Sequence, residues 1–262
     1  MTTDATGGTT QGPTGGRDGR VELTATCVVL DVEGTTSSTE SVLGGLYAYA
    51  RPRLGPWISG HGDDPDVARA VADVRASAGL GEDAPVEDVV RVLHGWMDSD
   101  VKATPLKTLQ GQIWADGFAA GALTAHFFDD VAPALRSWHA SGLRLAVFSS
   151  GSVASQRPWF RHTTAGDLSD LVEDHFDTAN AGAKREAASY SRIAQALGVG
   201  SGLLFLSDVP AELDAAAAAG WATVGVARPG EPQEHADFGS HPVVASFAEL
   251  EIVPVTLDRG VS

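Results

Sequence analysis

Two acidic residues, Asp31 and Glu33, stand directly behind an apolar, β-branched run at residues 26–30. Such a run is typical of a buried strand, and Gly34 allows the chain to turn sharply after it. We therefore expect both acids at the carboxyl end of a strand, where open α/β sheets bind ligands. A carboxylate in that position can act as a nucleophile if a cation neutralises the incoming anion. The alternative is an acid that only orders a loop.

Polar residues also follow two other predicted strands. Residues 143–148 lead into Ser149 and Ser150, and residues 203–206 lead into Asp208. Between these two strands lies Lys184, one of three lysines in a chain that has fifteen arginines. A compact ammonium in an arginine-rich chain suits a role as a point charge.

Together these residues suggest phosphoryl transfer. Asp31 would attack phosphorus and form an aspartyl-phosphate, and Glu33 would act first as general acid and then as the base that activates water. Mg²⁺ prefers hard oxygen ligands, and Asp31 and Asp208 can supply two of them. An Asp that merely caps a strand end is the alternative for Asp208.

The remaining polar residues suit an anion. Ser149 or Ser150, with backbone N–H groups near Gly151 and the start of the next helix, would hold phosphate oxygens. Lys184 would neutralise charge on the nucleophile and on the transferring group. The alternatives are an ordinary helix cap for the serines and a solvated helix start for the lysine.

The pattern along the chain predicts an α/β fold. Residues 1–20 are rich in Gly and Thr and lack an apolar signal core, so we expect a disordered tail there. Residues 42–125 have helical periodicity without a clear strand, whereas strands and helices alternate after residue 126. We predict a doubly wound parallel sheet formed by residues 21–41 and 126–254, an inserted helical cap at 42–125, and a flexible C-terminus at 255–262.

Within the predicted core, the elements are short and bounded by glycines. The expected strands span residues 26–30, 143–148, 203–206 and 223–227, and the expected helices span 131–141, 185–197 and 211–219, with another helix beginning at 153.

Composition excludes some classes of partner. The 262 residues carry a formal net charge of −16, which argues against a general binder of nucleic acid or of anionic membranes. No apolar stretch approaches the roughly 18 residues of a membrane-spanning helix. The single cysteine, Cys27, lies in the apolar strand pattern and is expected to pack in the core. A cytoplasmic setting fits these features.

The ordered set of motifs resembles the haloacid dehalogenase superfamily and, more narrowly, the enolase-phosphatases of methionine salvage. The resemblance covers roughly residues 26 to 250. It rests on six stretches: residues 30–36 (LDVEGTT), 106–114 (LKTLQGQIW), 148–156 (FSSGSVASQ), 175–178 (HFDT), 204–209 (LFLSDV) and 226–230 (VARPG).

This resemblance implies a haloacid dehalogenase-like core and a monomeric enzyme that holds one Mg²⁺ per subunit. The implied substrate is the small phosphorylated diketone 2,3-diketo-5-methylthiopentyl-1-phosphate, which is enolised and then dephosphorylated to the acireductone 1,2-dihydroxy-3-keto-5-methylthiopentene. Asp31, Glu33 and Asp208 match the metal positions, with Glu33 binding through its backbone carbonyl. The match assigns the substrate positions to Ser149, Ser150 and Lys184; the residue types name no base for enolisation.

In the cap motif, Lys107, Gln110 and Trp114 share one helical face. They would cover the substrate and exclude water, or Trp114 would simply pack in the cap core.

Other functions remain open at this point. One is a phosphatase of the same superfamily that acts on another small phosphate ester without enolisation. Another is a non-catalytic binding module on the same fold, since fold alone does not fix function. A hydrolytic dehalogenase fits less well, because Glu33 and Asp208 suit a metal-dependent phosphatase.

Overall fold

A computed structural model describes residues 14–15, 20–99, 101 and 103–255. The chain folds into two compact units. The first contains the described residues through Ser38, together with Phe127–Gly151 and those from Leu168 onward; the second contains Thr39–His126 and Ser152–Asp167. Most of the predicted tail (1–20) and nearly all of the predicted C-terminal segment (255–262) lie outside the described residues.

The first unit is built on a six-stranded sheet in which every pair of neighbouring strands is parallel. The strands are β3 (Cys27–Leu30), β4 (Arg144–Phe148), β5 (Asp174–Phe176), β6 (Leu203–Ser207), β7 (Ala222–Val226) and β8 (Val243–Val244), in the order β5-β4-β3-β6-β7-β8. The chain runs outward from β3 to β5, returns to β6 on the other side of β3, and runs outward again. The doubly wound parallel sheet is therefore confirmed, and its topological switch point lies between β3 and β6.

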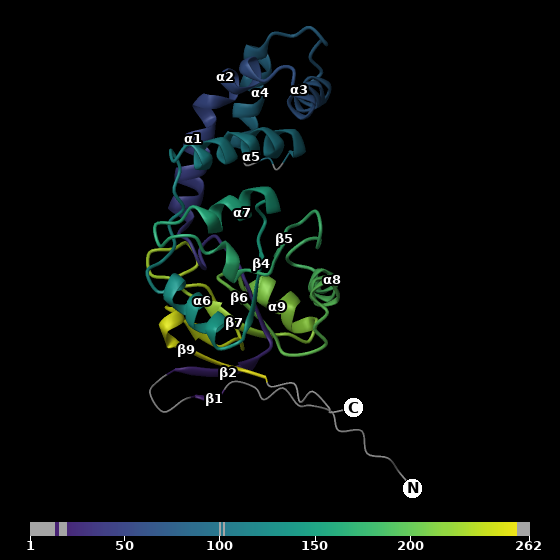
Figure 1. The fold of residues 1–262 in the computed structure, drawn as a ribbon. Helices are drawn as coiled ribbons and strands as arrows, with labels where there is room; N and C mark the ends of the chain where they lie inside the picture. The colour runs from purple at the N-terminus through teal and green to yellow at the C-terminus, as the bar shows by residue number, and fades with distance from the viewer. Residues whose placement is uncertain (1–13, 16–19, 100, 102, 256–262) are drawn as a thin grey trace, which may run out of the picture. The chain divides into compact units, whose positions relative to one another are not determined.

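Helices cover both faces of this sheet (Figure 1). α6 (Val131–Ala140) lies on one side, and α8 (Ala187–Leu197) and α9 (Pro210–Ala218) lie on the other. All four residues of β3 are fully buried, as a strand covered on both faces requires. Cys27 packs in the core on the α8 and α9 side, and burial raises the pKa of its thiol to about 12.

Several strands were not predicted. β2 (Val21–Ala25) pairs with β9 (Leu250–Pro254) in parallel and with β1 (Thr14–Gly15) in antiparallel orientation, which makes a separate three-stranded sheet. β1 lies inside the segment predicted to be a disordered tail. β5 and β8, at the two edges of the main sheet, are only three and two residues long. Runs this short carry little periodicity of their own.

The second unit is helical in its described residues. Its elements are η1 (Glu40–Tyr47), α1 (Ala48–Ala50), η2 (Arg51–Arg53), α2 (Leu54–Gly60), α3 (Pro65–Ser77), α4 (Val86–Asp98), α5 (Thr104–Ala119) and α7 (Val153–Arg161). α7 belongs here because it packs on α5, where the rings of Phe118 and Trp159 meet edge to face at 6.1 Å. The sequence pattern alone groups residues 152–167 with the sheet. The two remaining short helices, η3 (Ser169–Leu171) and η4 (Phe247–Glu249), belong to the first unit.

The three residues of the cap motif on α5, Lys107, Gln110 and Trp114, lie in different surroundings. Trp114 is buried, and its Nε1 donates to the Leu46 carbonyl at 2.8 Å, so Trp114 packs within the helical unit. Gln110 and Lys107 line a small recess of the helical unit, together with Tyr47 and Leu106. Gln110 is 2% exposed, and its Nε2 has no hydrogen-bond partner among the described residues.

None of the helices in the described ranges combines the length and the hydropathy that a bilayer-spanning segment needs.

Candidate active site

Asp31 lies at the carboxyl end of β3, where the chain leaves the sheet. Its backbone N–H donates to the Leu206 carbonyl at 3.0 Å, so the ladder to β6 continues through Asp31. Asp31 is 5% exposed, and its Oδ1 accepts from the Val32 N–H at 2.7 Å. Beyond it, the N–H groups of Thr35, Thr36 and Ser37 all donate to the Val32 carbonyl, which closes a tight turn. The predicted strand end and turn are both present.

Gly34 allows that turn to approach Asp208. Its φ of +71° belongs to the left-handed region, which favours glycine, and a Cβ added there would lie 2.3 Å from Oδ2 of Asp208. The hydroxyl of Thr35 completes the contact: it accepts from the Asp208 N–H at 2.9 Å and donates to Asp208 Oδ1 at 3.3 Å. The turn after β3 and the end of β6 are thus joined side by side.

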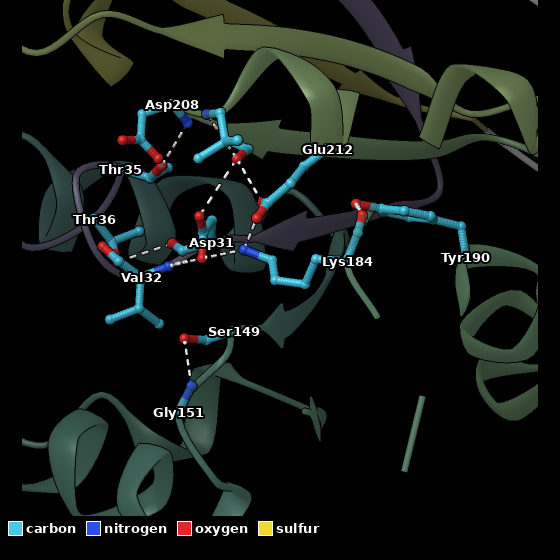
Figure 2. A network of polar contacts seen from close by, with 12 residues as sticks. Asp31, Val32, Thr35, Thr36, Ser149, Gly151, Lys184, Tyr190, Asp208 and Glu212 are labelled. Carbon is cyan, nitrogen blue, oxygen red and sulfur yellow. Dashed lines mark hydrogen bonds and ion pairs between the residues drawn. The ribbon is translucent and has the colours of Figure 1, made fainter. Parts of the chain in front are cut away.

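Lys184 reaches the same point from the loop between β5 and α8. Its Nζ lies 2.7 Å from Oδ1 of Asp31 and 2.6 Å from Oε2 of Glu212 (Figure 2). The side chain is 5% exposed. Tyr190, fully buried on α8, donates from its hydroxyl to the Lys184 carbonyl at 2.7 Å. Lys184 is therefore fixed at both ends, by the helix behind it and by the two carboxylates ahead of it.

The loop that carries Lys184 is itself ordered by side chains. Asp177 Oδ1 accepts from the N–H groups of Ala179 and Asn180, and Asn180 Oδ1 accepts from the Asp177 N–H at 2.8 Å. Gly182 has a φ of +104°, and a Cβ there would meet the Arg192 guanidinium. The contacts show why a small residue stands two positions before the lysine.

Glu212 was not among the predicted site residues. It lies in the first turn of α9, is 7% exposed, and accepts from the Ser207 hydroxyl at 3.0 Å as well as from Lys184. The Ser207 hydroxyl also lies 3.3 Å from Oδ2 of Asp31. An acid in the first turn of a helix usually complements the helix dipole. The sequence therefore offers no separate reason to place Glu212 in the site. The sequence signal that could have found it is its place in the first turn of the helix that directly follows Asp208.

The cluster of Asp31, Asp208, Glu212 and Lys184 contains three carboxylates and one ammonium, all buried. Burial, and then the charge of Asp31, raises the pKa of Asp208 to about 7. Burial also raises the pKa of Glu212. Although burial alone would lower the pKa of Lys184, the charges of Asp31 and Glu212 raise it above its ordinary value. Fully ionised, the cluster has an excess negative charge that a divalent cation would balance.

The donor set fits Mg²⁺. Asp31 and Asp208 offer hard carboxylate oxygens, and Gly34 leaves room for backbone and carboxylate to lie close together. Among the described residues, no group of three or more His, Cys, Asp or Glu side chains is arranged to hold a metal.

The predicted serines lie at the end of the neighbouring strand. Ser149 follows β4, is 8% exposed, and donates its N–H to the Phe176 carbonyl at 3.1 Å; its hydroxyl accepts from the Gly151 N–H at 3.3 Å. Ser150 is exposed. Because Leu30 of β3 pairs with Val147 of β4, Asp31 and Ser149 lie at the same edge of the sheet, where the strands end (Figure 2).

Glu33 lies within the tight turn, half-buried, and bridges to Ser37 through the backbone. The structure thus joins Asp31, Lys184 and Asp208 in one connected network, whereas Glu33, Ser149 and Ser150 lie on the flanking turns. The roles of all six residues stay predictions.

Comparison with known proteins shows the family of the chain. A family model described as haloacid dehalogenase-like hydrolase matches residues 25–220. A protein of Saccharopolyspora erythraea named Enolase-phosphatase E1 is 61% identical over 236 residues, which cover 89% of this chain and 98% of that protein. A protein of the same name from Pseudomonas aeruginosa is 45% identical and covers 88% of this chain and 100% of its own length.

A solved structure has a similar fold. The UTR4 protein of Saccharomyces cerevisiae aligns with a TM-score of 0.70 and 29% identity, covering 85% of this chain and 98% of that one. The chain belongs to the haloacid dehalogenase-like hydrolases and, within them, to the enolase-phosphatase family.

Proposed function

We propose that this protein enolises 2,3-diketo-5-methylthiopentyl-1-phosphate and then hydrolyses its phosphate to give the acireductone of methionine salvage. The single observation that carries the phosphatase half is the buried contact between Asp31, Lys184 and Glu212 beside Asp208, at the carboxyl edge of the sheet. Membership of the enolase-phosphatase family supports the choice of substrate.

Asp31 acts as the nucleophile. One carboxylate oxygen forms a bond to phosphorus while the bond from phosphorus to the substrate oxygen breaks, leaving an aspartyl-phosphate. Lys184 and the Val32 N–H both hold Oδ1 of Asp31, which fixes the orientation of the carboxylate before the phosphate arrives. A non-catalytic module would not need a carboxylate oriented in this way.

Glu33 carries the proton transfers. It protonates the departing oxygen of the acireductone and then, as a carboxylate, takes a proton from the water that attacks the aspartyl-phosphate. Its place in the turn two residues after Asp31 fits a group that acts on the same phosphoryl group.

Ser149, Ser150 and Lys184 bind the phosphate. A hydroxyl and the N–H groups that follow β4 donate to phosphate oxygens, and the Lys184 ammonium offsets the negative charge that collects there. Because Lys184 already contacts Asp31 at 2.7 Å, it neutralises nucleophile and phosphate together.

Mg²⁺, one per subunit, is the proposed cofactor, held by Asp31, Asp208 and the backbone carbonyl of Glu33. When bound, it supplies positive charge that lets an anionic nucleophile approach an anionic phosphate. We expect the enzyme to work as a cytoplasmic monomer on a small phosphorylated diketone, without nucleic-acid or membrane partners, and the net charge of −16 supports the latter part.

The test is to incubate the protein with the diketone phosphate and Mg²⁺ and to follow enol absorbance and free phosphate together. We expect an enol signal that precedes phosphate, and no phosphate with Asp31→Asn. Phosphate release from simple esters without turnover of the diketone would contradict the proposal and leave a phosphatase of the same superfamily with another substrate.

A further inference from the structure

Arg228, a buried residue outside the catalytic set, contacts the turn that follows Asp31. It lies two residues beyond β7 and is 3% exposed. Its Nε donates to the Thr35 carbonyl at 3.0 Å, although the two residues are 193 positions apart in the chain. A buried guanidinium is costly unless its donors are used, so its presence here calls for a function.

The other side of the guanidinium is firmly anchored. Nη1 lies 2.6 Å from Oδ2 of Asp130, and the same oxygen accepts from the Ser246 hydroxyl and the Phe247 N–H. Burial would raise the pKa of Asp130, but these hydrogen bonds hold that pKa below its ordinary value, so Asp130 and Arg228 form an ionised pair. The guanidinium carbon also lies 4.7 Å from the ring centre of Phe247. Nε and Nη1 of Arg228 are therefore both held, whereas its Nη2 is buried without a hydrogen-bond partner among the described residues.

A second contact from the same region reaches the turn. The N–H of Phe128 donates to the Thr36 carbonyl at 3.0 Å, and the Phe128 ring centre lies 4.5 Å from the Arg228 guanidinium carbon. Two consecutive carbonyls of the turn, those of Thr35 and Thr36, are thus held by residues that also contact each other.

Thr35 links this anchor to the carboxylates. Its carbonyl accepts from Arg228, while its hydroxyl accepts from the Asp208 N–H and donates to the Asp208 carboxylate. We propose that Arg228 is a positioning residue that, through Thr35, sets Asp208 and the turn behind Asp31 at the spacing a divalent cation requires. This inference rests on the proposed function, because it concerns the cation of the same site.

The shape of the side chain explains why arginine is needed. Nε and Nη1 donate to two acceptors, the Thr35 carbonyl and the Asp130 carboxylate, on different elements. A planar guanidinium does this with rigid geometry, whereas a lysine has one nitrogen on a flexible stem and cannot reproduce both contacts.

The test compares Arg228→Lys with a matched control, Arg144→Lys. Arg144 also binds a carboxylate, Glu173 at 2.6 Å, and a backbone carbonyl, that of Leu197. It is the first residue of β4, however, and so lies at the amino ends of the strands, away from Asp31. Mg²⁺ binding is measured by titration calorimetry on the full chain without substrate. We expect the Kd for Mg²⁺ to rise about tenfold in Arg228→Lys and to stay unchanged in Arg144→Lys.

A second variant keeps the test decisive if Arg228→Lys does not fold. Thr35→Val removes the hydroxyl that contacts Asp208 but leaves the carbonyl for Arg228, and we expect the same rise in the Kd for Mg²⁺. Thr35→Ser keeps a hydroxyl at this position and should retain the wild-type Kd. In Arg228→Lys, phosphate release at saturating Mg²⁺ should recover most of the wild-type rate. Wild-type Mg²⁺ affinity in Arg228→Lys or in Thr35→Val would overturn the inference. Because the titration uses no diketone, a wrong substrate assignment leaves its outcome unaffected.

Discussion

Replacing Asp208 with asparagine should stabilise the metal-free protein even though it removes a proposed metal ligand. Asp208 is 6% exposed and shares its surroundings with Asp31 and Glu212. Without Mg²⁺, ionising Asp208 in the folded state therefore works against folding. Asparagine has nearly the same shape, can still accept from the Thr35 hydroxyl, and carries no charge.

The size of the effect follows from the raised pKa. The pKa of Asp208 rises from 3.8 to about 7, roughly three pH units at 1.36 kcal/mol each, or about 4 kcal/mol at pH 8. Because the folded state binds the proton more tightly than the unfolded state, wild-type stability is fully present below pH 4 and is lost as the pH rises through 7. The advantage of Asp208→Asn should fall to below about 2 kcal/mol at pH 5.

Urea unfolding in EDTA, followed by tryptophan fluorescence, measures the stability advantage of Asp208→Asn over the wild type at pH 5 and at pH 8. The control is the same pair of curves in saturating Mg²⁺, where the wild type should gain stability and Asp208→Asn should gain much less. If Asp208→Asn is less stable than the wild type at pH 8 in EDTA, or if its advantage is independent of pH, the proposed electrostatic cost of Asp208 is wrong.

Three further substitutions test the same cluster. Lys184→Met removes the ammonium of the cluster and should destabilise the protein by about 3–5 kcal/mol at pH 8 and by less at pH 5, measured by urea unfolding. A destabilisation independent of pH would contradict the idea that Lys184 balances the charges of the carboxylates. Gly34→Ala places a Cβ against Asp208 and strains a φ of +71°, so thermal unfolding should show a loss of about 1–3 kcal/mol, together with weaker Mg²⁺ binding by calorimetry; unchanged affinity would show that the close approach is not needed. Asp31→Asn should release no phosphate while its circular dichroism spectrum matches the wild type, and retained turnover would exclude Asp31 as nucleophile.

The strands that carry the catalytic residues could be predicted because each is a buried apolar run followed by polar residues. β3, β4 and β6 were predicted for this reason. In a parallel sheet their carboxyl ends lie together, which brings Asp31, Ser149 and Asp208 to the same side. The position of Lys184 could not be predicted in the same way, since it lies in a loop whose path depends on contacts with α8.

Other features depend on contacts between distant segments, which no local pattern records. β2 and β9 pair across more than two hundred residues, and α7 joins the helical unit through its packing on α5 rather than through its sequence. The contact between Arg228 and Thr35 could not be predicted either, because the two residues are 193 positions apart in the chain. Glu212 has the appearance of an ordinary helix-start acid until Lys184 is placed beside it.

The measurement that tests the central claim most directly is detection of the phosphorylated nucleophile. The protein is mixed with Mg²⁺ and the diketone phosphate, quenched in acid within a single turnover, and digested for mass spectrometry. The account predicts an aspartyl-phosphate at Asp31. Borohydride reduces this acyl-phosphate, so that phosphate is released and the aspartyl residue becomes homoserine. Full phosphate release with no acyl-phosphate at Asp31, or with the phosphoryl group on another residue, would contradict it.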